Sequence, residues 1–266
     1  IGEPIYSGWI PPVLSSSPHQ WDDSHQQALA YVPYLVSGDY YYLEELQFWA
    51  SANMLLTSSG TRQSQIGTQV RGQAWSMRTL GEAAYITPDT HPLKTHFVNR
   101  TKLYISKYTD RYPNDPTANK LGVIWSSNDL ESSAKLSNAY FTVWMDDYLT
   151  WAFGHLVELG FTEAIPFRNW KTKFIVDRMG GSEAAGQMCW QVSSPSQYKM
   201  GEGLVWYPDI ATVYANNYPA ALRTLTCNTQ AYADYVKINN GEPTFKINAM
   251  MPYGKSADGH PMKAQI

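Results

Sequence analysis

Four short stretches of the chain combine carboxylates, imidazoles, a guanidinium group and aromatic rings at spacings that suit chemistry. The first is Trp21-Asp22-Asp23-Ser24-His25. Two carboxylates beside an imidazole can transfer protons near neutral pH, and an indole offers a stacking surface. We predict that Asp22, Asp23 and His25 are catalytic and that Trp21 binds substrate. The alternative is that Asp23 or Ser24 only caps a helix against which Trp21 packs.

The second stretch contains Gln69, Arg71, Gln73 and Trp75. A guanidinium group can hold a carboxylate through two parallel hydrogen bonds, and the amide and indole beside it add polar and stacking contacts. Arg71, Gln73 and Trp75 are therefore predicted to bind substrate. In the alternative interpretation, Arg71 pairs with a nearby acidic side chain of its own chain.

The third stretch places polar and aromatic residues three and four positions apart, so a helix would carry them on one broad face. These residues are Trp144, Asp147, Tyr148, Trp151 and His155. A charged carboxylate on so apolar a helix is costly unless it is paired or functional. We predict that Asp147 and Tyr148 are catalytic and that Trp144 and Trp151 bind substrate. The alternative makes His155 a hydrogen-bonded core residue and turns Asp146 toward solvent.

The fourth stretch is Trp206-Tyr207-Pro208-Asp209. Trp206 and Tyr207 are predicted to bind substrate as an aromatic platform. Asp209 is a good residue to cap the helix that follows. No phosphate-binding glycine loop, Gly-x-Ser-x-Gly turn or His-Glu-x-x-His pattern is present, so neither a cofactor nor a metal is predicted.

Helices separated by short turns must position these stretches. Apolar periodicity predicts helices over 23–36 (with a kink or break at Pro33), 42–57, 70–85, 92–108, 139–159, 162–179, 208–225 (interrupted at Pro219) and 229–238. Turns rich in Gly, Pro and Asp separate them, as at Gly38-Asp39 and Gly160. A short ribbon is expected at 204–207 or 244–247. This pattern predicts an all-α domain of antiparallel helical hairpins over 25–238, after an extended segment 1–24 and before an irregular tail 239–266.

Composition excludes several classes of partner. The formal net charge is −3 and no run of basic residues occurs, which argues against nucleic-acid binding. No stretch approaches the ~20 apolar residues that span a bilayer. Cys189 and Cys227 are the only cysteines; they form either one bridge or two buried thiols. Because Ile1 takes the place of an initiator Met and no signal-peptide pattern follows, we expect a processed product or part of a larger chain or assembly.

The residues from His25-Gln26-Gln27 through Tyr31-Val32-Pro33-Tyr34-Leu35-Val36-Ser37-Gly38-Asp39 to Leu43, and then Arg71-Gly72-Gln73-Ala74-Trp75, resemble (α/α) toroid carbohydrate-active proteins. These are the six-hairpin glycosidases and the toroid polysaccharide lyases. The resemblance covers roughly residues 19–180. It implies a polysaccharide or oligosaccharide partner and a site at one rim of the helices. The length fits an arc of about four hairpins, or an incomplete barrel, rather than a full ring.

Within that resemblance two reactions stay open. A glycoside hydrolase needs two carboxyl groups ~5 Å or ~6.5–9.5 Å apart; Asp22 or Asp23 with Asp146 or Asp147 is the candidate pair. A lyase needs a Tyr or His base and a group that neutralises a uronate; His25, Tyr40 or Tyr148 with Arg71 would serve.

The favoured function is therefore binding and cleavage of a polysaccharide in an aromatic groove at the mouth of the helical arc. The competing hypothesis is a non-catalytic structural or glycan-attachment domain of a larger protein or assembly. The location is left open among extracellular, periplasmic and virion-associated.

Overall fold

The computed structural model describes residues 28–57, 65–67, 69–124, 140–141, 143–179, 187–193, 198–203 and 205–239. Helices dominate this part of the chain, which confirms the all-α class. The chain divides into two compact units. Unit 1 extends to Tyr108 and includes Ala152–Ala164; unit 2 comprises Thr109–Trp151 and the chain from Ile165.

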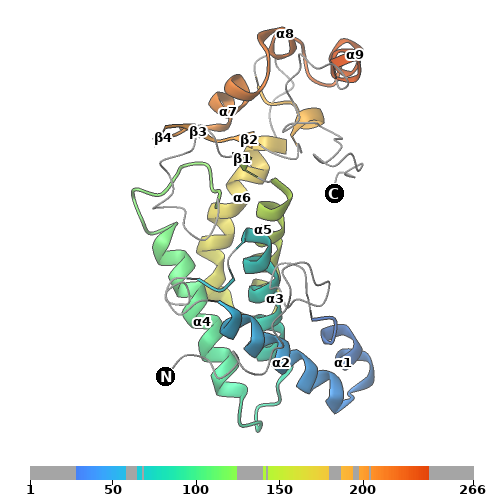
Figure 1. Cartoon of the computed structure of the whole chain (residues 1–266), viewed down its shortest axis with the longest axis vertical. Helices are drawn as coiled ribbons and strands as arrows, with labels where there is room; N and C mark the ends of the chain where they lie inside the picture. Colours follow the sequence, from blue (N-terminus) through green and yellow to red (C-terminus); the bar gives the residue numbers. More distant parts are fainter. Residues whose placement is uncertain are drawn as a thin grey trace, which may run out of the picture. The chain divides into compact units, whose positions relative to one another are not determined.

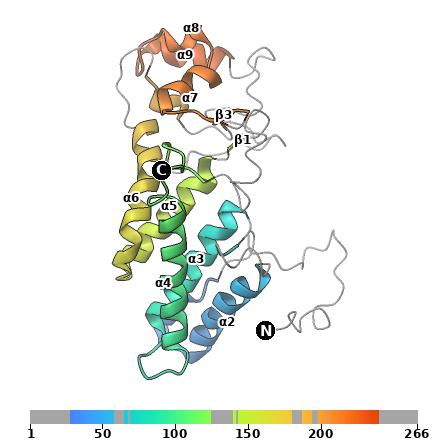
Figure 2. The ribbon, with the colours of Figure 1, turned by 90° about the vertical axis from the view of Figure 1, so that its left-hand side faces the viewer.

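Unit 1 is built from helices, and most of their bounds lie close to the predicted ones; the helix predicted over 139–159 is wrong at its start, because residues 140–141 form a strand and the helix begins at Val143. They are α1 (Tyr31–Ser37), α2 (Tyr40–Leu56), α3 (Val70–Ile86) and the parts of α4 (Lys94–Arg111) and α5 (Val143–Glu158) that belong to this unit. Helix α2 packs along α3, and α1 contacts both (Figure 1; Figure 2). The turns predicted at Gly38-Asp39 and at Gly160 are present, between α1 and α2 and directly after α5.

The first helix begins later than predicted. Residues 28–30 are not helical, so the helix predicted from Asp23-Ser24 to Val36, with a kink or break at Pro33, is wrong in this part. Helix α1 starts at Tyr31, which places Pro33 in the first turn, where a missing N–H costs nothing. Gly38 ends α1 with φ +67°, and the Asp39 carboxylate accepts a hydrogen bond from the Tyr41 N–H at 2.9 Å to start α2.

The core of unit 1 forms around α3. Its predicted apolar stripe is buried throughout, and Gly81 lies so close to Leu156 of α5 that a Cβ there would collide with the leucine side chain. Helix α4 meets α3 through Thr101, whose hydroxyl lies 3.4 Å from the Leu80 carbonyl oxygen. The close approach of α3 and α5 sets the side chains of these two helices against one another.

Unit 2 combines helices with two short ribbons. Its elements are β1 (Tyr140–Phe141), α6 (Ile165–Met179), β2 (Tyr198–Lys199), β3 (Gly201–Glu202), β4 (Val205–Trp206), α7 (Ile210–Asn217), α8 (Ala220–Arg223) and α9 (Gln230–Asn239). β1 pairs antiparallel with β2, and β3 with β4. The ribbon predicted at 204–207 is therefore present as β4. The interruption predicted at Pro219 separates α7 from α8.

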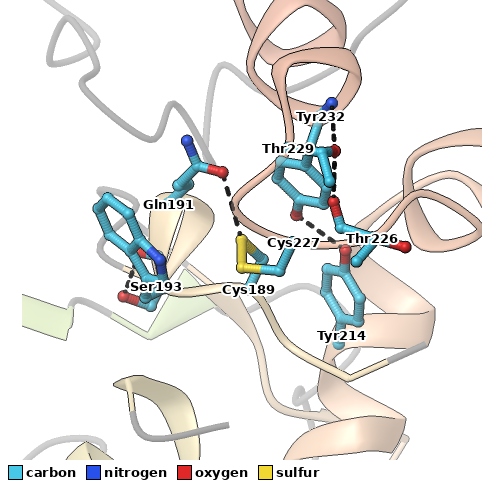
Figure 3. Close-up of a disulfide and its surroundings, with 9 residues drawn as sticks. Cys189, Gln191, Ser193, Tyr214, Thr226, Cys227, Thr229 and Tyr232 are labelled. Atoms are coloured by element: carbon cyan, nitrogen blue, oxygen red, sulfur yellow. Dashed lines mark hydrogen bonds between the residues drawn. A yellow bond between two sulfur atoms is a disulfide. The ribbon is translucent and has the colours of Figure 1, made fainter. Parts of the chain in front are cut away.

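A disulfide between Cys189 and Cys227 lies in the core of unit 2 (Figure 3). Of the two alternatives for the cysteines, the single bridge is the correct one; their Cα atoms are 5.3 Å apart and both residues are buried. Beside it, the Tyr214 and Tyr232 hydroxyls are hydrogen-bonded at 2.9 Å and join α7 to α9. Burial raises the pKa of Tyr214.

None of the helices in the described ranges is both long and apolar enough to cross a membrane.

Candidate functional site

A carboxylate–imidazole pair on two helices of unit 1 is the centre of the candidate site. Glu82 of α3 is buried, and its Oε1 lies 3.3 Å from Nε2 of His155 on α5. On the other side of the ring, His155 Nδ1 lies 3.4 Å from Oε2 of the exposed Glu158. The site, which we call the Glu82–His155 cluster, comprises Tyr31, Trp75, Arg78, Glu82, His155 and Glu158.

Arg78 holds Glu82 from the same helix, one turn earlier. Its Nε lies 3.4 Å from Glu82 Oε1, and an Nη2–H donates to the Ala28 carbonyl oxygen at 2.7 Å. The guanidinium carbon lies 4.5 Å from the centre of the half-buried Trp75 ring. These contacts fix the carboxylate that faces His155 and engage the guanidinium group on three sides.

Helix α1 covers the imidazole with an aromatic ring. Tyr31 meets His155 edge to face, with ring centroids 5.9 Å apart. Burial raises the pKa of the Tyr31 hydroxyl, and the nearby Glu82 carboxylate raises it further. Tyr31 therefore keeps its proton in this site, which makes it a donor rather than a base.

The surroundings of His155 favour the charged form of its imidazole. Hydrogen bonding to Glu82 raises the pKa of His155, Glu158 adds to the shift, and partial burial opposes it. Its side chain keeps 16% of its surface exposed, so the ring is not sealed in the core. A carboxylate that orients an imidazole is the arrangement used in general acid–base catalysis, which is most efficient when the pKa lies near the working pH.

Sequence reasoning found only part of this cluster. It named Trp75, and it weighed His155 mainly as a hydrogen-bonded core residue; Tyr31, Arg78 and Glu82 were missed. A signal existed, because Arg71, Trp75, Arg78 and Glu82 follow one another at spacings of four, three and four, which places them on one helix face. Their contact with His155, 73 positions beyond Glu82 in the chain, could not be read from that spacing.

The two adjacent carboxylates of α5 lie in unit 2, and each is paired with a basic residue of α6. Asp147 Oδ1 and Oδ2 accept from Arg178 Nη2 at 2.6 and 2.7 Å. Asp146 forms an ion pair with Lys171, and both side chains are fully buried. The alternative that turned Asp146 toward solvent is therefore wrong: a partner on another helix makes its burial tolerable.

The buried pair is completed by backbone groups of one loop. The Ile124 N–H donates to Asp146 Oδ1 at 3.0 Å, and Lys171 donates to the Gly122 carbonyl oxygen at 3.0 Å. Burial raises the pKa of the Asp146 carboxyl, while Lys171 and the Ile124 N–H act in the opposite direction. Two ion pairs therefore join α5 to α6, and the predicted catalytic residue Asp147 belongs to one of them.

Other predicted site residues of unit 2 differ in how exposed they are. Tyr148 stacks on Trp151 with ring centroids 5.5 Å apart and planes 15° apart, and half of the Trp151 surface is exposed. Trp144 and Trp206 are half-buried. Tyr207 is buried in the core of unit 2, so its ring does not form an exposed platform with Trp206.

In unit 1, two predicted substrate-binding residues contact their own chain. Gln73 is fully buried, and its Oε1 accepts from the Tyr108 hydroxyl at 2.7 Å. Arg71 donates to Gln69 Oε1 at 3.2 Å. The remaining predicted residues, Trp21, Asp22, Asp23 and His25, lie outside the described part of the chain.

Within the described ranges, no group of three or more His, Cys, Asp or Glu side chains is arranged to hold a metal ion. Comparison with known protein families, with curated proteins and with solved structures finds no match for the chain.

Proposed function

We propose that this chain is a carbohydrate-active domain, with hairpins arranged as an (α/α) toroid-like arc, that binds a polysaccharide and cleaves it by proton transfer at His155. The observation that carries the proposal is the ion pair between Glu82 and His155, because it holds a partly exposed imidazole, 16% of whose side-chain surface is accessible, beside an aromatic ring. The packing of the successive helices α1, α2 and α3 against one another supports the arrangement.

Each member of the cluster has a distinct role in the proposal. His155 exchanges a proton with the glycan, and Glu82 orients the ring and stabilises its charged form. Arg78 fixes Glu82, so it is a positioning residue. Tyr31, which keeps its proton because its pKa is raised, donates a hydrogen bond from the α1 side.

The disulfide in unit 2 supports a prediction about the compartment in which the protein is located. Disulfides persist in oxidising compartments, so the buried Cys189–Cys227 bridge supports an extracellular or periplasmic location. Polysaccharides are met in both places.

A panel of soluble polysaccharides, assayed for new chain ends, tests the proposal. Loss of general acid–base catalysis in His155→Gln is expected to lower kcat by about 10²–10⁴-fold. His96→Gln is the matched control, because His96 is an exposed histidine of α4 in the same unit. Equal activity in His155→Gln and wild type would contradict the assignment.

The burial of Gln73 and Tyr207 favours the second candidate, a non-catalytic structural or glycan-attachment domain, because two residues expected to contact a ligand are instead buried, Gln73 in a hydrogen bond with Tyr108. A wild-type protein that cleaves none of the polysaccharides would support this candidate. Binding without cleavage, measured by calorimetry on the same panel, would identify an attachment domain.

A further inference from the structure

The charges of the Glu82–His155 cluster bear on which glycan it can accept. Its acidic members are Glu82 and Glu158, which flank His155 on both sides. Arg78 is the only basic member apart from His155 itself. Even with His155 protonated, the two carboxylates balance the two cations, and with His155 neutral the cluster is negative.

Arg78 is not placed to receive a second carboxylate. Its guanidinium group already contacts Glu82 and the Ala28 carbonyl oxygen, lies over Trp75, and belongs to a side chain that is only 13% exposed. β-Elimination beside a uronate depends on a cation that neutralises the substrate carboxylate, as removal of the neighbouring proton builds charge there. A uronate entering beside His155 would instead meet Glu82 and Glu158.

The second carboxylate oxygen of Glu82, Oε2, can accept a hydrogen bond from a ligand. No described residue donates a hydrogen bond to its Oε2, although this atom is buried. A buried acceptor without a donor is costly, and a ligand hydroxyl can satisfy it. Tyr31, which contacts His155, belongs to a seven-residue helix with no buried side chain, so displacing this helix would cost little apolar burial.

We infer that the cluster takes an uncharged, hydroxyl-bearing glycan and cleaves it by hydrolysis rather than β-elimination; this rests on the proposed function. The glycosidic C–O bond breaks as His155 gives its proton to the leaving oxygen. Water supplies a hydroxyl group to the anomeric carbon, and its proton passes to a carboxylate of the cluster and then back to His155. Each turnover consumes one water and forms one new reducing end.

Paired neutral and uronate oligomers of the gluco, manno and galacto series test this inference with the wild-type chain. We expect the neutral oligomers to bind about tenfold more tightly or better, and to yield reducing ends without the ultraviolet absorbance of an unsaturated uronate. Tighter binding of uronates, or appearance of that absorbance, would overturn the inference and leave the proposed function standing. Failure of every oligomer to bind would overturn the proposed function itself, and binding of neutral oligomers without cleavage would overturn hydrolysis.

A charge reversal provides a second measurement that does not depend on turnover. Glu158 is 79% exposed, so Glu158→Lys is expected to fold. In Glu158→Lys, the ratio of the affinity for neutral oligomers to that for uronate oligomers should fall by about fivefold. This corresponds to the upper end of the energies measured for exposed charge pairs. Glu44→Lys, on the exposed surface of α2, is the matched control and should leave the preference unchanged. An equal effect of both substitutions would show that only net charge matters and would overturn the assignment to this cluster.

Discussion

His155 Nε2 on α5 lies 3.3 Å from Glu82 Oε1 on α3, and this contact gives unit 1 a pH-dependent link between two helices. Among the described residues, Glu82 from α3 and Glu158 from α5 itself lie beside the imidazole, and the ring of Tyr31 from α1 meets it edge to face. The contact is therefore strongest when His155 is charged.

The first prediction concerns the pH dependence of stability. The folded pKa of His155 is raised, so its contribution is complete below the unfolded value of about 6.5 and is lost as pH rises through the folded pKa. The difference in unfolding free energy between wild type and His155→Gln should shrink from acid to alkaline pH. Urea unfolding across that range measures it.

His96 provides a control of opposite sign. Although His96 is largely exposed, partial desolvation lowers its pKa and Arg100 lowers it further, so its contribution is present above about pH 6.5 and is lost as pH falls through the folded pKa. The difference in unfolding free energy between wild type and His96→Gln should therefore shrink toward acid pH. Parallel slopes for the two variants would contradict the assignment of the shift at His155 to Glu82.

The second prediction concerns the buried pair of Asp146 and Lys171. Asp146→Ala leaves a buried ammonium group without its partner, and should cost about 3–5 kcal/mol of unfolding free energy. Combining it with Lys171→Met removes the stranded charge and should restore most of that loss. Guanidinium unfolding of the two variants provides the comparison.

The solvent-accessible pair of the exposed Lys173 and the half-buried Asp177, on the same helix as Lys171, serves as the control. Because solvent screens this pair, Asp177→Ala should cost no more than about 1 kcal/mol. If Asp146→Ala and Asp177→Ala lost similar unfolding free energy, the burial of the Asp146–Lys171 pair would not explain its contribution to stability.

Local sequence signals predicted the helices well because their causes are local. The stripe on α3, the left-handed Gly38 and the caps at Asp39 and Asp209 each depend on residues within one or two turns. The start of α1 was misplaced because the capping residues at Asp23-Ser24 outweighed the effect of Pro33, which belongs in a first turn.

The site was only partly predictable because its contacts join distant segments. Asp146 looks like a surface residue until Lys171, 25 positions later, is brought to it by the packing of α6. Gln73 likewise looks like a ligand-binding amide until Tyr108 of α4 donates to it. Periodicity states which residues share a face, but it does not state which second helix covers that face.

The third prediction concerns the disulfide of unit 2. Cys189 and Cys227 are 38 positions apart, and their bond restricts the unfolded chain. The double variant Cys189→Ser and Cys227→Ser should lose about 2–5 kcal/mol. Thermal unfolding with and without a reductant checks this: the wild type should become less stable in reductant, and the double variant should not respond. A reductant-sensitive double variant would contradict the role of this bond.

The fourth prediction concerns Gly122, whose carbonyl oxygen accepts from Lys171. Its φ is +79°, and a Cβ at this position would collide with the Trp170 carbonyl oxygen, a backbone atom that cannot rotate away. Gly122→Ala should therefore cost at least the 1–2 kcal/mol of a left-handed non-glycine residue, with a further loss from displacing the loop that holds the buried pair.

Gly154, in the interior of α5, is the matched position, because a Cβ there meets no atom within 4 Å. Gly154→Ala should stabilise by about 0.5–1 kcal/mol, since alanine loses less backbone entropy in a helix. Urea unfolding measures both changes in unfolding free energy. If Gly122→Ala destabilises and Gly154→Ala stabilises, the destabilisation at Gly122 is due to its left-handed conformation and its close contact with Trp170. A stabilising Gly122→Ala would contradict the loop geometry around Lys171.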